Sequence, residues 1–249
     1  MRGILFDFNG VLVDDEPLHC RFLRETLAED GIALTEREYY DVYLGFDDRG
    51  CFTTALAGAG RPSGPDRVAE LTERKAARYA AHVERHGLPF FPGALELLDE
   101  ALAAGIAVGI VSGALRREIE LALRHVGRLG ALRCLVAAED VAVGKPDSEG
   151  YRRGYDLLAR AVPAGALPLA PRDVVAIEDS PAGLESARGA GLRTLGVTHT
   201  YRVGELSLAE VVVESFVGLS PTRLENLFAA PSGGPAASPP GGAGSRGRR

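Results

Sequence analysis

The chain is poor in the residues that build disulfide or zinc scaffolds. Its 249 residues include only three cysteines, Cys20, Cys51 and Cys134, which lie far apart with no CxxC pair. Neither a disulfide framework nor a zinc site is therefore expected. No apolar run approaches the ~20 residues that a membrane-spanning helix needs, and the N-terminus leads directly into a short apolar segment without a signal-peptide layout. We therefore expect a cytoplasmic protein with no membrane partner.

Positive charge and lysine are also scarce. The formal net charge is −6, which gives no electrostatic reason to expect nucleic acid or an anionic membrane surface as a partner. Of the 28 basic residues only Lys75 and Lys145 are lysines, so each is a candidate for a specific role. The apolar content of 46% and charged content of 25% are typical of a globular chain, long enough for one large domain or a domain with an insertion.

Most of the sequence alternates helical patterns with short apolar runs. Runs that are apolar throughout lie at residues 4–6, 106–111, 134–137, 174–177, 195–197 and 211–213. Strands that are apolar on both faces and separated by helices form a parallel sheet covered on both sides. The pattern predicts an α/β fold with a doubly wound parallel sheet, whose functional groups lie at the carboxyl ends of the strands.

Two segments depart from this alternation. Residues 15–87 have polar helical patterns and no long apolar run, which predicts a helical domain inserted into a core made of residues 1–14 and 88–230. Residues 231–249 are mostly Gly, Pro, Ser and Ala and end in Arg-Gly-Arg-Arg. This composition cannot bury enough apolar surface to offset the entropy of ordering, so we expect a disordered tail.

Four polar signals fall in loops beside the apolar runs. They are Asp7, Ser112-Gly113, Lys145 in the segment before a helix, and Glu178-Asp179. Because loops at the carboxyl ends of one sheet converge, these groups are expected to surround one pocket.

This set of groups suits phosphoryl transfer. A carboxylate such as Asp7 that attacks a phosphate meets repulsion between anions. A hard divalent cation relieves it, and Mg²⁺ takes oxygen ligands from one or two carboxylates and from the phosphate itself. Lys145 would neutralise the remaining phosphate charge. Ser112 and backbone N–H groups would hold the phosphoryl oxygens, helped by a helix N-terminus after Gly113.

The order of these motifs carries a family resemblance. The chain resembles the haloacid dehalogenase (HAD) superfamily, in its β-phosphoglucomutase-like and phosphatase branch. The first motif of that family is Asp-x-Asp-Gly-x-Leu-x-Asp, and the matching segment here is Asp7-Phe8-Asn9-Gly10-Val11-Leu12-Val13-Asp14. Ser112 matches the second motif, Lys145 in its Gly-Lys-Pro setting the third, and Glu178-Asp179-Ser180 the fourth. The likeness covers about residues 2–217.

The resemblance implies a Rossmann-like core, a helical cap over residues 15–87 and a Mg²⁺-dependent phosphatase acting on a small phosphorylated metabolite. It implies that Asp7 is the nucleophile that forms an aspartyl intermediate. It also implies a metal site made by Asp7, Asn9, Glu178 and Asp179. In this site Asp179 binds Mg²⁺ directly, Glu178 through water and Asn9 through its backbone carbonyl. We further expect a monomer or weak dimer.

Asn9 departs from the family pattern. The family has an Asp there, which protonates the leaving oxygen and then activates water. An amide is neither a useful acid nor a useful base near neutral pH, whereas the backbone carbonyl is unchanged. Because general acid–base catalysis contributes ~10²–10⁴-fold, we expect a slow phosphatase that still forms the intermediate. It should show a burst of product, and Asn9→Asp should raise its activity.

Two other functions stay open. Dehalogenation of a small acid needs no proton on the leaving halide, which suits Asn9, but the Glu178-Asp179 pair argues against it. A non-catalytic binder of a phosphate ligand is also compatible with the missing acid.

Two residues of the helical segment are weaker candidates for substrate binding. His19 matches a histidine at the hinge of the resembled branch, where it either contacts substrate or packs the cap against the core. Arg49 ends the segment Gly45-Phe46-Asp47-Asp48-Arg49, which resembles the specificity loop of the cap. It is a candidate for binding a second phosphate or a carboxylate.

Overall fold

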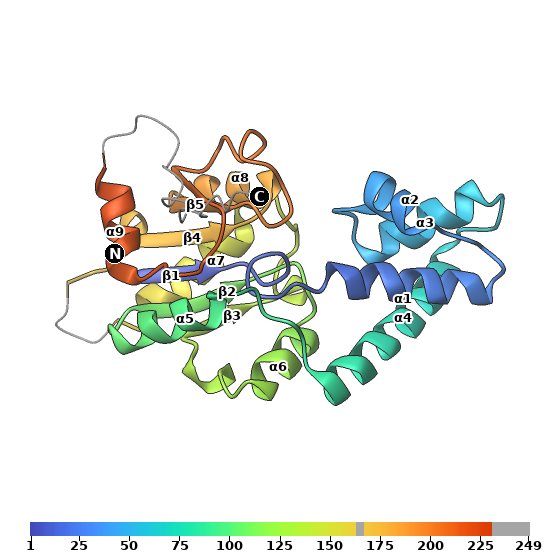
Figure 1. The fold of residues 1–249 in the computed structure, drawn as a ribbon, viewed down its shortest axis with the longest axis horizontal. Helices are drawn as coiled ribbons and strands as arrows, with labels where there is room; N and C mark the ends of the chain where they lie inside the picture. Colours follow the sequence, from blue (N-terminus) through green and yellow to red (C-terminus); the bar gives the residue numbers. More distant parts are fainter. Residues whose placement is uncertain (163–166, 231–249) are drawn as a thin grey trace, which may run out of the picture.

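A computed structural model describes residues 1–162 and 167–230. Its centre is a six-stranded sheet with the order β3-β2-β1-β4-β5-β6, in which every neighbouring pair is parallel (Figure 1). The strands are β1 (Gly3–Phe6), β2 (Ala107–Val111), β3 (Cys134–Val136), β4 (Val174–Glu178), β5 (Arg193–Val197) and β6 (Val211–Val213). Each strand overlaps one of the apolar runs, so the predicted parallel sheet is confirmed. The tail predicted to be disordered, residues 231–249, lies outside the described residues.

The strand order reverses beside β1. The chain places β2 and β3 on one side of β1 and then crosses to place β4, β5 and β6 on the other. Such a switch point leaves a crevice at the carboxyl ends of the central strands. Phe6 is in register with Ile110 of β2 and Ile177 of β4. The loops that follow these three strands therefore begin side by side.

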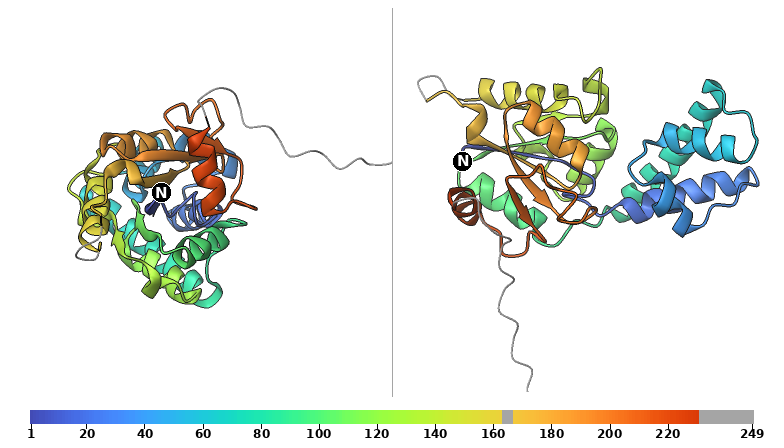
Figure 2. Two further views of the ribbon diagram at one scale, coloured as in Figure 1. Left: turned by 90° about the vertical axis from the view of Figure 1, so that its left-hand side faces the viewer. Right: turned by 90° about the horizontal axis from the view of Figure 1, so that it is seen from above.

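Helices bury both faces of the sheet (Figure 2). One face packs against α5 (Ala94–Ala103), α6 (Arg116–His125) and α9 (Pro221–Ala229), and the other against α7 (Glu149–Arg160) and α8 (Pro181–Gly189). Ile4 and Phe6 point into the first apolar core, and Leu5 points into the second. This alternation along β1 explains why the strand has no polar side chain on either face.

A purely helical unit lies beyond the carboxyl ends of the strands (Figures 1 and 2). It consists of α1 (Glu16–Glu29), α2 (Glu36–Glu38), the π-helix η1 (Tyr39–Tyr43), α3 (Asp48–Gly58) and α4 (Pro65–His86). The unit has its own apolar core, in which Leu27, Phe52 and Leu71 are buried. The long helix α4 leads back toward the sheet and contacts α6. The predicted fold class, a parallel α/β core with an inserted helical unit, is thus confirmed.

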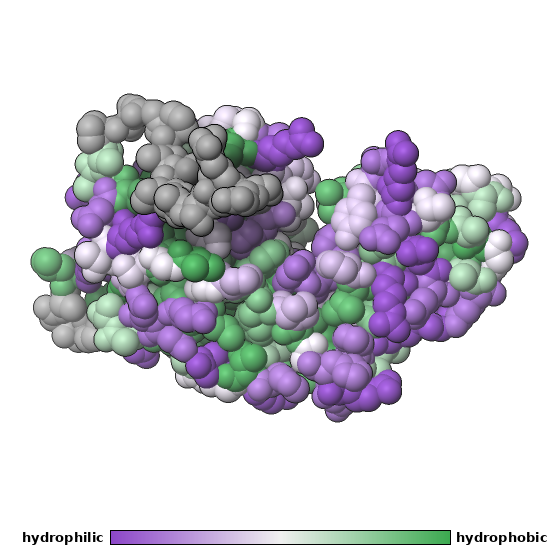
Figure 3. All heavy atoms as spheres, in the orientation of Figure 1, coloured by the Kyte–Doolittle hydropathy of each residue, from purple (hydrophilic) through white to green (hydrophobic). Residues whose placement is uncertain are grey.

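The surface of the helical unit is largely hydrophilic in the view of Figure 3. Ion pairs link α4 to the end of α1, including those of Arg74 and Arg78 with Glu29. Partly exposed pairs of this kind stabilise a fold only modestly, so the apolar interior is what holds the unit together. None of the described helices has both the length and the apolarity needed to cross a bilayer.

Candidate active site

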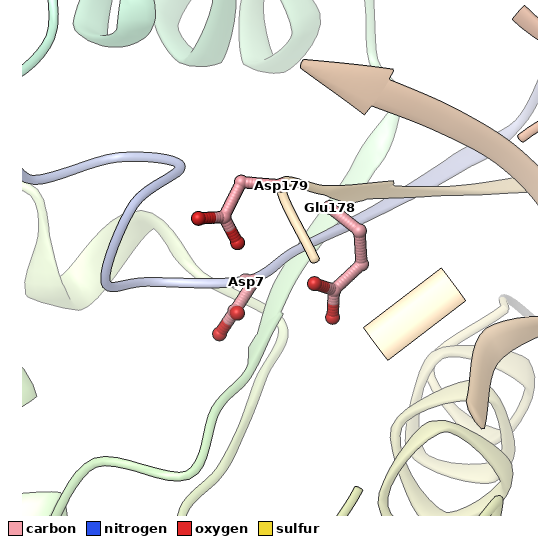
Figure 4. Close-up of side chains that lie close together, drawn as sticks. All are labelled: Asp7, Glu178 and Asp179. Carbon is pink, nitrogen blue, oxygen red and sulfur yellow. The ribbon is translucent and has the colours of Figure 1, made fainter. Parts of the chain in front are cut away.

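Three carboxylates meet at the switch point of the sheet. Asp7 directly follows β1, Glu178 is the last residue of β4, and Asp179 comes next. The Asp7 backbone N–H donates to the Ile177 carbonyl across the two strands (3.0 Å). One oxygen from each carboxylate lies within 4.8 Å of the others, and Figure 4 shows the three side chains close together. The strand pairing alone therefore brings together acids that are far apart in the sequence.

Lys145 supplies positive charge to this cluster. Its Nζ lies 2.8 Å from Asp7 Oδ2 and 2.6 Å from Glu178 Oε1. Burial alone would lower the pKa of the Lys145 ammonium, but Asp7 and Glu178 outweigh that effect and raise the pKa. The lysine is therefore charged at neutral pH. Glu178 also accepts a hydrogen bond from the Tyr151 hydroxyl of α7 (2.6 Å), which holds its carboxylate in place.

Burial and crowding disfavour negative charge on two of the acids. Burial, and after it the charge of Asp7, raises the pKa of Glu178 to about 8 and that of Asp179 to about 7. Glu178 is fully buried and Asp179 is 6% exposed. Neighbouring carboxylates in a poorly solvated site take up protons unless a cation balances them. The cluster therefore has an electrostatic need for positive charge beyond that of Lys145.

The donor set fits a hard divalent cation. The cluster offers only carboxylate oxygens, which are the ligands that Mg²⁺ prefers. When all three acids are ionised and Lys145 is protonated, the four groups carry a formal charge of about −2, which one divalent ion would balance. Gly10 keeps the backbone near Asp179, since a Cβ there would lie 2.0 Å from Asp179 Oδ2, and its φ of 72° also favours glycine. The turn after Asp7 thus passes directly beside the acidic cluster.

Ser112 follows β2 on the other side of β1 from Glu178. Its hydroxyl accepts a hydrogen bond from the Ala114 N–H (3.1 Å), so it closes a tight turn. The helix expected after Gly113 is α6, which begins at Arg116 with Leu115 as its extended N-cap residue. A Cβ at Gly113 would meet nothing within 4 Å. The backbone there is open to a ligand, and the N-terminus of α6 follows at Arg116.

Asn9 is turned toward Asp15. Its side-chain Nδ2 donates to Asp15 Oδ2 (2.7 Å). The same oxygen accepts a hydrogen bond from the Tyr79 hydroxyl of α4 (2.5 Å) and lies 3.1 Å from His19 Nε2 of α1. Asp15 is 1% exposed. Asp15 was not among the predicted site residues, although an acid directly after the last Asp of the first motif was a visible signal.

His19 continues this polar network into the helical unit. Its Nδ1 lies 2.6 Å from Lys75 Nζ, so the tautomer with hydrogen on Nε2 lets His19 accept from Lys75 and donate to Asp15. Lys75 is 1% exposed and is also paired with Asp48 at the start of α3. Of the two alternatives for His19, this arrangement favours packing between helices and core over a direct contact with substrate. Its role in binding stays a prediction.

Arg49 is exposed in the first turn of α3, and none of the ion pairs found among the described residues includes it. The nearby Gly45 is exposed but lies close to Tyr201, since a Cβ added there would lie 3.3 Å from the Tyr201 hydroxyl. Tyr201 belongs to the segment that follows β5. The expected specificity loop of the helical unit therefore passes close to Tyr201, a residue that was not among the predicted site residues.

Comparison with known proteins gives one family and a consistent set of relatives. The sequence model of the family "Haloacid dehalogenase-like hydrolase" matches residues 4–197. Validoxylamine A 7'-phosphate phosphatase from Streptomyces hygroscopicus subsp. limoneus is 30% identical over 210 residues, which cover 84% of this chain and 92% of that protein. Hexitol phosphatase A from Escherichia coli (strain K12) is 29% identical over 226 residues, covering 90% of this chain and 96% of that protein.

Solved structures with the same fold come from the same group of proteins. CbbY from Rhodobacter sphaeroides, in complex with phosphate, superimposes with a TM-score of 0.77 at 27% identity and covers 90% of this chain and 99% of that chain. A mutant of that protein, solved in complex with xylulose-(1,5)bisphosphate, gives the same TM-score, identity and coverage. The fold and the sequence therefore point to the same group of proteins.

Proposed function

The chain belongs to the haloacid dehalogenase-like hydrolase family, and we propose that it is a Mg²⁺-dependent phosphatase that forms an aspartyl-phosphate on Asp7. Hydrolysis of phosphoric monoesters is the activity named for its relatives. The observation that carries the proposal is the cluster of Asp7, Glu178 and Asp179, with oxygens within 4.8 Å of one another and Lys145 bridging two of them. This arrangement supports a site that binds a cation and a phosphoryl group together.

Asp7 is oriented for attack by two contacts. Its Oδ1 accepts from the Phe8 N–H (2.7 Å), and its Oδ2 lies 2.8 Å from Lys145 Nζ. Attack of an Asp7 oxygen forms a new O–P bond and breaks the ester P–O bond. The leaving group departs as its alkoxide or phenolate and takes its proton from solvent water, since Asn9 supplies none. Lys145 offsets the charge of the phosphoryl oxygens, and Ser112 and the backbone at Gly113 donate hydrogen bonds to them. A bound Mg²⁺ would polarise the phosphoryl group and reduce the repulsion between the anions.

The second step is hydrolysis of the aspartyl-phosphate. Water adds to phosphorus, the bond to Asp7 breaks, and inorganic phosphate leaves. The water must lose a proton, which passes to bulk solvent, because the Asn9 amide has no useful basicity and cannot accept it. We propose that this step is slow, so that esters with good leaving groups react in a rapid first turnover and then stall.

The relatives and the helical unit support a proposal for the substrate class. The relatives act on phosphorylated small molecules according to their names. Arg49 is exposed at the start of α3, where it is free to bind a second anionic group of a substrate. We therefore propose a small phosphorylated metabolite, with Arg49 as a determinant of which one.

The test is a panel of phosphomonoesters, including p-nitrophenyl phosphate, measured with Mg²⁺ and with a chelator. We expect turnover that requires Mg²⁺, disappears in Asp7→Asn and Asp179→Asn, and begins with a burst of one equivalent of nitrophenol per enzyme. Activity that is independent of metal, or that persists in Asp7→Asn, contradicts the proposal. Asp14→Asn is the matched control, since Asp14 is exposed beside the same segment.

A non-catalytic binder of a phosphate ligand is the second candidate. The hydrogen bond between Asn9 and Asp15 favours it, because that amide offers no proton to a leaving group. Phosphate or phosphoester binding that survives in Asp7→Asn, together with no turnover by the natural protein, would establish it. Dehalogenation stays the third candidate, and a strict requirement for Mg²⁺ would exclude it.

A further inference from the structure

The Asp15 carboxylate has an unusual position for a charged group. It is 1% exposed and sits between the first loop of the core and two helices of the helical unit. Its Oδ2 is surrounded by Asn9 Nδ2, Tyr79 OH and His19 Nε2 at 2.7, 2.5 and 3.1 Å. Its Oδ1 is buried and has no hydrogen-bond partner within the described part of the chain. A buried carboxylate is stabilised by its hydrogen-bond donors. Loss of any one of these three donors would therefore destabilise the ionised Asp15.

Asn9 is the donor that comes from the candidate active site itself. Tyr79 and His19 belong to α4 and α1, whereas Asn9 lies in the loop that begins at Asp7. An amide donates through Nδ2 and accepts through Oδ1, so a hydrogen bond from Nδ2 to Asp15 fixes which way the amide faces. Asn9 Oδ1 is left to accept a hydrogen bond, as from a water molecule. Asp15 therefore sets the orientation of the side chain at position 9.

A carboxylate at position 9 would not fit this arrangement. An ionised Asp has only acceptors, so Asn9→Asp would place two acceptor groups where an N–H donor now bridges 2.7 Å. Asp15 would lose one donor, and the new side chain would be pushed away from it. Asn9→Asp alone is therefore expected to raise the activity less than the loss of the family's Asp would suggest, because Asp15 repels the new carboxylate.

We propose that Asn9 and Asp15 form an exchanged pair, in which Asp15 positions residue 9 and a carboxylate works at position 9 only when position 15 carries the amide. The pair rests on the proposed phosphatase function and deepens it, since it states what this site needs to regain acid–base catalysis. Asp15 acts as a positioning residue. The group that would handle protons is the side chain at position 9.

Four proteins of nearly identical shape test the pair: the natural protein, Asn9→Asp, Asp15→Asn, and the double exchange Asn9→Asp with Asp15→Asn. In the double exchange the amide nitrogen of Asn at position 15 takes the place of Oδ2, which both Asn9 and Tyr79 contact in the natural protein. Its two N–H groups can donate to Asp at position 9 and to the Tyr79 hydroxyl, which then acts as the acceptor. We expect its kcat for a poor leaving group to exceed that of the natural protein by ~10²-fold or more, with KM little changed. Asn9→Asp alone should gain less than about a tenth of this, because its carboxylate is displaced.

Thermal unfolding provides a readout that does not need activity. We expect Asn9→Asp alone to lower Tm by about 4 °C or more, and the double exchange to recover most of that loss. Asp14→Asn combined with Asn9→Asp is the matched control. It removes an exposed charge next to Asp15, and its effect on Tm should simply add to that of Asn9→Asp.

The outcomes separate the two proposals. Additive effects of Asn9→Asp and Asp15→Asn on both Tm and kcat overturn the exchanged pair. A full gain in kcat from Asn9→Asp alone also overturns it. If Tm is strongly non-additive but none of the four proteins hydrolyses a phosphoester, the positioning of residue 9 by Asp15 stands and the proposed phosphatase function fails. Rescue of both quantities by the double exchange supports both.

Discussion

The two lysines of the chain lie in two polar clusters of opposite character. Lys145 contacts Asp7 and Glu178 at the sheet edge, where three carboxylates face one ammonium. Lys75 contacts His19 and Asp48 inside the helical unit. The first cluster has more acceptors than donors, so it is suited to bind a cation. In the second cluster the donors are paired with acceptors of the same cluster. It is therefore suited to hold the helices and the core loop in place.

The largest effect is expected from breaking the first cluster. Lys145→Met removes the ammonium that would balance the phosphoryl oxygens, and we expect kcat for p-nitrophenyl phosphate to fall ~10²–10³-fold. Steady-state kinetics with saturating Mg²⁺ measures this. A Lys145→Met protein within tenfold of natural activity would show that the lysine serves the fold and not the chemistry.

A smaller effect, on stability, is expected from breaking the second cluster. Lys75 is almost fully buried, and Lys75→Met leaves Asp48 and His19 without their shared partner. Because Asp48 is partly exposed, we expect a loss of about 2–3 kcal/mol in the free energy of unfolding, measured by urea denaturation. The rise in Tm on adding Mg²⁺ should be the same as in the natural protein. Loss of that rise would contradict the separation of the two clusters.

The smallest predicted effect is the pH dependence of the stability that the first cluster contributes. The raised pKa values of Glu178, about 8, and Asp179, about 7, mean that the folded protein holds these protons more tightly than the unfolded chain. Stability from the two groups is fully present below about pH 4 and is lost as the pH rises through 7 to 8. Because Mg²⁺ would replace these protons, its stabilising effect should grow with pH.

Differential scanning calorimetry with and without Mg²⁺ tests this, at about pH 6 and about pH 8.5. We expect a larger Mg²⁺-induced rise in Tm at the higher pH, by a few degrees. The trend should disappear in Asp179→Asn and remain in Asp14→Asn. An equal rise at both pH values would mean that the acids do not exchange protons for the metal ion.

The fold was predictable because its signals are local. The strands β1, β2 and β4 are short runs that are apolar throughout, and their burial on both faces is what such runs require. The π-helix over Tyr39–Tyr43 had no such signal. It depends on the packing around the segment more than on its own pattern.

The candidate site was predictable in part for a related reason. Polar residues directly after buried strands must lie at one edge of a parallel sheet, so the convergence of Asp7, Glu178 and Asp179 followed from the order of strands and loops. Their catalytic roles stay predictions. Asp15 was missed because its partner Tyr79 is 64 residues away, and no local pattern shows that a carboxylate will be buried against it.

By itself the sequence determined which segments become strands, where charged groups follow them, and that position 9 carries an amide. These properties depend on side-chain polarity and on the periodicity of single elements. Only the tertiary structure decided that Asn9 faces Asp15 and that Lys75 and Lys145 occupy separate clusters. A buried polar group must find its partner wherever packing provides one, and packing joins residues that the chain keeps far apart.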